Sequence, residues 1–275
     1  MRKLISIASI CSMIALAAIA GCSSNDDPLK PTPIESGNYF PRTEGSYWVY
    51  EYYTTDSNGI VIADTKRIDS VTVQAETSKL EKLCNPFVTI TSKGGTSTDY
   101  FYGDTNKLFA LSDYVFLKQG AIPIQLPVFE QSWMKIADFA VESEIKLFDS
   151  TMAHLTFDWN GSPIQLENVN YYITAQKTTD KISITVNGKT QNAYCFVIKH
   201  HIAGKIIYGI YSLNFTTTPT IRNYYSANIG LVKTTMDPLV MTTAPIDLSS
   251  VAGNLIPKQG FSSTLVNYSI GIPVK

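Results

Sequence analysis

The sequence predicts an all-β protein, with at most one or two short helices, built on one large, curved antiparallel sheet in the form of a half-barrel or open barrel. Three observations lead to this fold class. Apolar and aromatic residues alternate with a period of two along most of the chain, as they do in half-buried strands. Asn-Gly and Gly-Gly pairs separate these segments, and strands and helices do not alternate as a parallel sheet would require.

The expected strands follow one another as a meander of antiparallel neighbours. The first, around residues 47–53, is rich in aromatic and β-branched residues. Turn residues follow it at 55–59, and further turns are expected at Lys93-Gly94-Gly95, Asn160-Gly161 and Asn187-Gly188. The strands are expected at residues 46–54, 60–76, 86–92, 97–103, 107–111, 143–149, 153–158, 164–175, 180–187, 190–202, 205–215, 220–225 and 229–235.

Two segments leave alternatives open. Residues 129–141 fit either a short amphipathic helix or a loop followed by a strand, and the second interpretation is slightly favoured. Residues 263–270 fit either a last strand that pairs back onto the sheet or an edge that faces a partner. A sheet of about a dozen strands accumulates twist, so it is expected to curl or close rather than stay flat.

The first 21 residues have the pattern of a signal peptide. A basic start at Arg2 and Lys3 precedes an apolar stretch of 17 residues, which is short for a membrane-spanning helix of ~20. The stretch ends in Ile19-Ala20-Gly21-Cys22, which resembles the lipobox of bacterial lipoproteins. The resemblance implies cleavage before Cys22 and attachment of fatty acyl chains such as palmitate to this residue. Two or three such chains hold a protein on a membrane far better than one.

Residues 22–38 are expected to form a lipidated flexible tether, because three prolines keep this segment extended. By resemblance, Ser23 after the lipidated cysteine is compatible with the outer membrane, and the acidic pair Asp26-Asp27 is similar to surface-export signals; a plain solvated linker explains both equally well. The protein could therefore face the periplasm or the cell surface. A single β-rich domain is expected at 39–275.

The charge balance excludes some partners. Cleavage after residue 21 removes two of the 22 basic side chains and none of the 23 acidic ones, so the mature net charge is about −3. Because nucleic acids and anionic lipid surfaces select basic proteins, neither is an expected partner. Beyond the lipobox the chain carries two cysteines, Cys84 and Cys195. In an oxidising compartment they could form a disulfide, and two buried free thiols are an equal alternative.

Two stretches resemble a family of uncharacterised β-rich lipoproteins of Gram-negative bacteria. One reads Tyr39-Phe40-Pro41-x-x-x-Gly45-x-x-Trp48-x-Tyr50, and the other runs over residues 223–233 and ends in Gly230-Leu231-Val232-Lys233. Residues 133–139 also fit this family, whereas Asn228 replaces a more usual small residue. The pattern is more distantly similar to the half-barrels of periplasmic lipoprotein carriers, whose concave face holds acyl chains. The resemblance implies an outer-membrane lipoprotein and contains no catalytic signature.

The sequence predicts no catalytic residue, metal ligand or cofactor. It contains no nucleophile elbow, zinc-protease motif or phosphate-binding loop. Cys195 and His201 would share one face of a strand about 20 Å apart, and His200 would face the other way, so no thiol–imidazole pair is expected. A turn at Ala203-Gly204 would place both histidines at a strand end. Carboxylate pairs such as Glu142 with Glu144, or Asp138 with Asp158, remain as candidates from distant segments.

The aromatic residues offer the best candidate binding surface. Trp48, Tyr50 and Tyr52 share one face of the first strand, where they could contact a sugar ring or an acyl chain. The alternative, which is favoured, is that they form the core. We therefore expect a membrane-anchored envelope protein with a non-enzymatic binding or structural role, whose partner is a lipid, a glycan or a protein. The alternative function is an envelope hydrolase whose carboxylates are assembled by the fold.

Overall fold

The computed structural model describes residues 36–112, 131–159, 162–208, 211–238, 240–244 and 259–272. Its contacts divide the chain into Met1–Ser36 and a compact unit, Gly37–Lys275. The fold described below is that of the compact unit. The predicted signal peptide, Cys22 and the greater part of the expected tether lie outside the described residues.

Within these ranges the structure is an antiparallel sheet with one 3₁₀ turn, η1 (Ala63–Thr65). The strands are β1 (Tyr47–Thr55), β2 (Arg67–Val73), β3 (Thr77–Lys79), β4 (Lys82–Thr91), β5 (Thr96–Gly103), β6 (Lys107–Ser112), β7 (Ser132–Asp138), β8 (Ile145–Trp159), β9 (Ser162–Val186), β10 (Lys189–Tyr208), β11 (Tyr211–Thr217), β12 (Thr220–Ser226), β13 (Gly230–Met236), β14 (Met241–Ala244) and β15 (Gly260–Ser269). No helix in the described ranges is long and apolar enough to cross a membrane.

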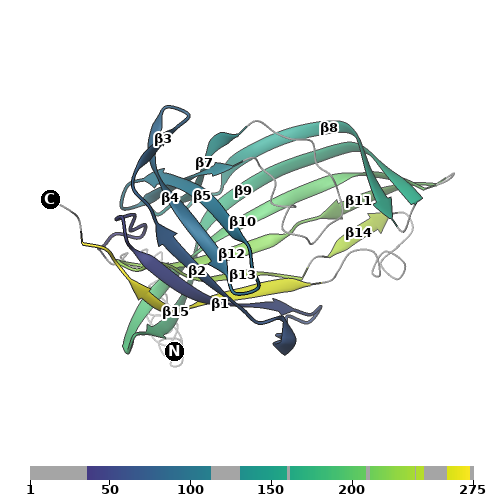
Figure 1. The fold of residues 1–275 in the computed structure, drawn as a ribbon. Coiled ribbons are helices and arrows are strands. Elements are labelled where there is room, and N and C mark those ends of the chain that lie inside the picture. The colour runs from purple at the N-terminus through teal and green to yellow at the C-terminus, as the bar shows by residue number, and fades with distance from the viewer. Residues whose placement is uncertain are drawn as a thin grey trace, which may run out of the picture. The chain divides into compact units, whose positions relative to one another are not determined.

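The strand order makes the sheet curve around until it is nearly closed. Neighbouring strands run β14-β11-β10-β12-β13-β15-β1-β2-β4-β5-β6-β7, while β9 pairs with the other edge of β10 and β8 pairs with β9. The long strands β8, β9 and β10 form one wall, and the shorter strands β1, β2, β4 and β5 lie together in another part of the sheet (Figure 1). Because β7 comes back into contact with β8 and β9, the two ends of the sheet approach each other. The predicted fold class is therefore confirmed.

Several expected turns and strands are present. Asn187 and Gly188 adopt positive φ values of 52° and 74° between β9 and β10, as a two-residue hairpin loop requires. Gly94 and Gly95 turn between β4 and β5 with φ values of 85° and 112°. Asn160-Gly161 lies outside the described residues. Residues 132–138 form strand β7, so the strand alternative for this region is correct and the helix is wrong.

Other strand boundaries differ from the prediction, which had divided long strands at polar or small residues. Strands expected at 143–149 and 153–158 are one strand, β8, and those expected at 164–175 and 180–187 are one strand, β9. Ala203-Gly204 is not a turn: it is an irregularity inside β10, so His200 and His201 lie within a strand. A Cβ on Gly204 would contact the Glu167 carbonyl at 3.1 Å, which explains why glycine occupies this position. The strand expected at 60–76 begins only at Arg67, after η1.

The last strand pairs inside the sheet. β15 is hydrogen-bonded to β13 on one side and to β1 on the other, so it is not a free edge that faces a partner. The first and last strands of the chain are therefore neighbours, with β1 paired along β15 from Gly260 to Ser269 and β13 paired with it at residues 261–264.

A short segment before β1 enters the concave side of the sheet. Tyr39 and Phe40 are 0% and 4% exposed. The Tyr39 ring stacks on Phe139 at 4.3 Å between centroids, and the Phe40 ring meets the Tyr225 ring edge-on at 5.1 Å. The backbone N–H of Tyr39 donates to the carbonyl of Thr105, which follows β5. We call residues 38–42 the inner segment.

Candidate functional site

The curved sheet encloses a cavity of about 310 Å³ that is partly open to solvent. Its wall contains residues of β12 and β13 and also of β4 to β7, which are far apart in the strand order. These strands can share one cavity only on the concave side of the sheet. The inner segment contributes a further part of the wall. The volume lies at the lower end of the range for small-molecule sites, about 300–1,000 Å³.

The wall is mainly aromatic, and two of the three predicted binding residues belong to it. Trp48 and Tyr50 line the cavity and are at the same time 3% and 8% exposed core residues. The two interpretations of this strand face, that it forms the core and that it binds a ligand, are therefore compatible. The other aromatic residues of the wall are Tyr39, Phe40, Phe87, Phe101 and Tyr225.

Hydrogen bonds to β13 and to the turn before it fix both side chains. The Trp48 indole Nε1–H donates to the Ile229 carbonyl at 2.7 Å, and the Tyr50 hydroxyl donates to the Leu231 carbonyl at 2.9 Å. Burial raises the pKa of Tyr50, so its hydroxyl stays protonated. The donors of both side chains are thus engaged within the protein, and a ligand would contact these residues through their apolar rings.

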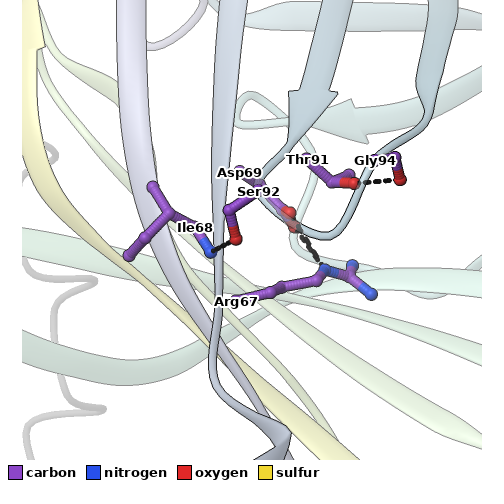
Figure 2. A network of polar contacts seen from close by, with 6 residues as sticks. All are labelled: Arg67, Ile68, Asp69, Thr91, Ser92 and Gly94. Carbon is purple, nitrogen blue, oxygen red and sulfur yellow. Dashed lines mark hydrogen bonds and ion pairs between the residues drawn. The ribbon is translucent and has the colours of Figure 1, made fainter.

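Tyr52, the third predicted residue, lies beyond the cavity. Its ring stacks on Phe261 at 5.4 Å, and the Arg67 guanidinium carbon lies 3.6 Å from its centroid. Arg67 Nε also donates to both carboxylate oxygens of Asp69, at 2.9 and 3.0 Å, as Figure 2 shows. The charge of Arg67 is therefore paired with a carboxylate, and its flat face is covered by an aromatic ring.

The same close-up shows how the neighbouring strands are joined. The Ile68 N–H donates to the Ser92 hydroxyl at 2.9 Å, and the Thr91 hydroxyl donates to the Gly94 carbonyl at 2.7 Å (Figure 2). These bonds attach β2 to the β4–β5 turn and hold the turn in shape. The concave face thus changes along the strands from aromatic at the cavity to polar near this turn.

Arg42 is the basic residue of the cavity wall. Its guanidinium donates to Asn85 Oδ1 at 3.1 Å and to the Gly103 carbonyl at 2.6 Å. Burial lowers the pKa of Arg42, and the nearby carboxylates Glu76 and Asp104 oppose this effect. Arg42 therefore ties the inner segment to β4 and to the end of β5.

Asp99 is the acidic residue of the wall, and sequence analysis did not single it out. The residue is exposed to solvent, while the surrounding protein raises the pKa of the carboxyl group. Within the described part of the chain no hydrogen bond or ion pair reaches this carboxylate. The alternation in 96–103 places Asp99 on the same strand face as Phe101, and this is the signal by which it could have been found.

The two cysteines are free and buried, so the structure contains the free thiols and not the disulfide alternative. Cys84 Sγ donates to the Thr77 carbonyl at 3.4 Å, whereas Cys195 interacts with Thr178 and Tyr224. Burial is the main cause of a raised pKa at each thiol, which keeps them protonated and unreactive.

The histidines have other partners than Cys195. His200 is 4% exposed and its Nδ1 shares a hydrogen bond of 2.8 Å with the Tyr171 hydroxyl. His201 shares a hydrogen bond of 3.2 Å with the Thr174 hydroxyl and stacks on Tyr172. The two imidazoles therefore contact different residues. Burial lowers the pKa of His200 to about 3.

The candidate carboxylate pairs are bound to lysines. Glu142 lies 3.2 Å from the Lys177 ammonium, Glu144 lies 3.6 Å from that of Lys199, and Asp138 accepts from Lys135 at 2.9 Å. The Asp158 side chain lies outside the described part. Among the described residues no group of three or more His, Cys, Asp or Glu side chains could hold a metal ion.

The fold and cavity together define an all-β protein with a small aromatic-walled site. No family model matches the chain, and no curated protein matches it. Similar solved structures include a "putative lipoprotein" from Parabacteroides distasonis, with a TM-score of 0.44 and 15% identity over 86% of this chain and 100% of the other. Another is a "putative exported protein with YmcC-like fold" from Bacteroides fragilis, with a TM-score of 0.37 and 10% identity over 85% and 100%. Both TM-scores are below 0.5 and carry no argument about this chain.

Proposed function

We propose that this protein is a lipid-anchored protein of the outer membrane whose curved sheet binds a small, largely apolar ligand without chemical conversion. The observation that carries the proposal is the cavity of about 310 Å³ on the concave face. Concave, mostly apolar sites with a few polar groups are the usual form of small-molecule sites. The lipobox-like sequence that ends in Cys22 supports the anchor.

The geometry favours a small ligand over a large lipid. At about 30 Å³ per water molecule, the cavity has room for about ten waters. A single ring system or a short chain would fit within this space, and a lipid with several acyl chains would exceed it. The polar groups of the wall lie on β4, β5 and β12 and on the inner segment, where they can orient a ligand.

Native mass spectrometry of the chain from Ser23 onward tests this function. This chain keeps the whole compact unit, and we expect one small molecule to be retained per chain or one neutral apolar fluorophore, N-phenylnaphthylamine, to bind per chain. Thr89→Phe should abolish binding, because Thr89 lines the cavity and phenylalanine would fill it. The matched control is Ile90→Phe on the same strand, since Ile90 is 57% exposed and lies outside the cavity wall.

Two results would contradict the proposal. One is an apo mass with no fluorophore bound to the unmodified chain. The other is a Thr89→Phe variant that binds as tightly as the unmodified chain, because binding would then occur outside the cavity.

A further inference from the structure

The cavity wall contains two charged side chains, Arg42 and Asp99, and only Arg42 has partners among its described neighbours. The two terminal nitrogens of Arg42 donate to Asn85 and Gly103, and the carboxylates of Glu76 and Asp104 lie near its guanidinium. Asp99 has no counterpart of this kind in the residues that the structure describes. The cavity therefore presents to a ligand one negative charge that the protein itself does not pair.

Some of the other polar groups of the wall are also engaged within the protein. Trp48 and Tyr50 donate to backbone carbonyls of residues 229 and 231, so neither N–H nor O–H is available to a ligand acceptor. Asn223 accepts the Thr234 hydroxyl through its side-chain oxygen at 2.9 Å. The Tyr225 hydroxyl and the Thr89 hydroxyl are neutral groups that can either donate or accept. Asp99 is thus the charged group of the wall for which a ligand can supply a partner that no described residue supplies.

Aromatic rings flank this carboxylate. Asp99 is the direct cross-strand partner of Phe87, and Phe101 follows it two residues along the same strand face. Phe87 meets Phe101 edge-on at 4.9 Å and stacks on Trp48 at 5.9 Å, so these rings form one continuous aromatic wall. The negative faces of such rings attract cations, and sites for organic ammonium groups combine them with desolvation.

We propose that the cavity selects a protonated organic amine, whose ammonium group lies against the Asp99 carboxylate and whose apolar part lies among Trp48, Phe87 and Phe101. This proposal rests on the proposed function and specifies the chemical class of its ligand. A carboxylic acid of the same size would bring a second negative charge to Asp99, and the charge of Arg42 is already partly compensated by the nearby carboxylates of Glu76 and Asp104. An alcohol could donate to Asp99, but it would lose the charge attraction.

Three probes of nearly equal size separate these cases: 2-phenylethylamine, 2-phenylethanol and 3-phenylpropanoate. Their dissociation constants are measured by calorimetry at pH 7, with the full chain held in lipid nanodiscs and empty nanodiscs as the blank. We expect the amine to bind about tenfold more tightly than the alcohol, and the acid to bind most weakly. Asp99→Asn should remove the preference for the amine, and Asp99→Glu should retain most of it.

The matched control is Asp64→Asn, which changes the net charge equally at an exposed aspartate of η1, outside the cavity. This variant should keep the full preference for the amine. Circular dichroism establishes that each variant is folded before binding is measured.

The outcomes distinguish the two proposals. Equal binding of amine and alcohol, or a preference that survives in Asp99→Asn, would overturn the amine assignment while the small-ligand function stands. If none of the three probes binds and N-phenylnaphthylamine also fails to bind, both proposals are wrong. An amine preference lost in Asp99→Asn and kept in Asp64→Asn supports the assignment.

Discussion

His200 is a titratable group buried within the curved sheet. It contacts the Tyr171 hydroxyl at 2.8 Å, and the Tyr171 ring lies parallel to the imidazole with 6.0 Å between the centroids. Burial, and to a lesser extent the neighbouring His201, lowers the pKa of His200 to about 3, so the imidazole is neutral in the folded protein. In the unfolded chain it would bind a proton near pH 6.5.

This difference predicts a pH dependence of stability. Because the pKa is lower in the folded state, the unfolded state binds more protons below pH 6.5, and the free energy of unfolding falls as the pH falls toward 3. Between pH 7 and pH 5, His200 should account for a loss of about 2 kcal/mol. Urea unfolding at both pH values, compared between the unmodified chain and His200→Gln, measures this loss.

Glutamine keeps an acceptor for the Tyr171 hydroxyl, and carboxylate titration is common to both proteins, so the difference isolates the imidazole. His154→Gln, at an exposed histidine, is the control and should behave as the unmodified chain does. If His200→Gln loses as much stability between pH 7 and pH 5 as the unmodified chain, the imidazole is not held neutral.

Of the individual residues in the cavity wall, the sequence predicted some. The alternation in β1 placed Trp48 and Tyr50 on one face, and the structure brings both into the cavity wall. The strand alternation could have placed Asp99 beside Phe101, but the role of Arg42 could not be predicted, because it depends on contacts between segments far apart in the chain. Arg42, for example, reaches Gly103 across 61 positions of sequence. No local pattern records such a pairing.

Among the elements, the β3–β4 hairpin has the least suitable turn sequence. Lys79 pairs with Lys82, so the loop consists of Leu80 and Glu81, which adopt positive φ values of 44° and 62°. Residues with a Cβ avoid this region, and two-residue loops of this kind favour Asn-Gly. Sequence analysis therefore missed this hairpin, whereas the Asn187-Gly188 hairpin was predicted correctly.

Relief of this strain should stabilise the protein. The double substitution Leu80→Asn with Glu81→Gly is expected to raise the free energy of unfolding by about 1 kcal/mol, measured by urea unfolding at pH 7. The reverse exchange, Asn187→Leu with Gly188→Glu, should lower it by at least as much, because it also removes the bond from Asn187 Nδ2 to the Tyr268 carbonyl. A double substitution at 80 and 81 that destabilises the chain would show that the Leu80 and Glu81 side chains contribute more than their backbone strain costs.

Strand boundaries were predicted less well than strand existence, for a physical reason. The strands expected at 164–175 and 180–187 left a gap at residues 176–179, yet the structure continues β9 through this gap to Val186. Pairing with β10 along nearly its whole length supplies hydrogen bonds that offset weak local propensity. Long strands are thus determined by their neighbours and not by their own composition.

For the whole molecule, the period-two pattern and the number of strands were sufficient to predict the curved sheet. They were not sufficient to predict its closure, which depends on which strands pair across the chain. The cavity is a consequence of this closure together with the inner segment, so its existence could not be read from any single motif.

The proposed lipid anchor on Cys22 can be tested in the whole protein. With Cys22→Ala we expect the protein to lose incorporated palmitate and to leave the detergent phase in a Triton X-114 partition, because no acyl chain would hold it. Cys11→Ala, which removes the other cysteine of the leader, is the matched control and should keep both properties. Palmitate that is still incorporated in the Cys22→Ala variant would contradict the lipobox interpretation.

The pairing of β1 with β15 sets an order of events during synthesis. The Gly271 N–H donates to the Ser46 hydroxyl across 225 positions of sequence, and Asn38 bonds to Asn228 across 190. The ribosome delivers β1 and β2 early, so one edge of β1 pairs with a strand that follows it directly. The other edge, which pairs with β15, lacks its partner until nearly the whole chain has emerged. A chain that stops before Gly260 would leave one edge of β1 without its neighbour. A chain that ends early would therefore keep an unpaired strand edge, which is a template for pairing with other chains.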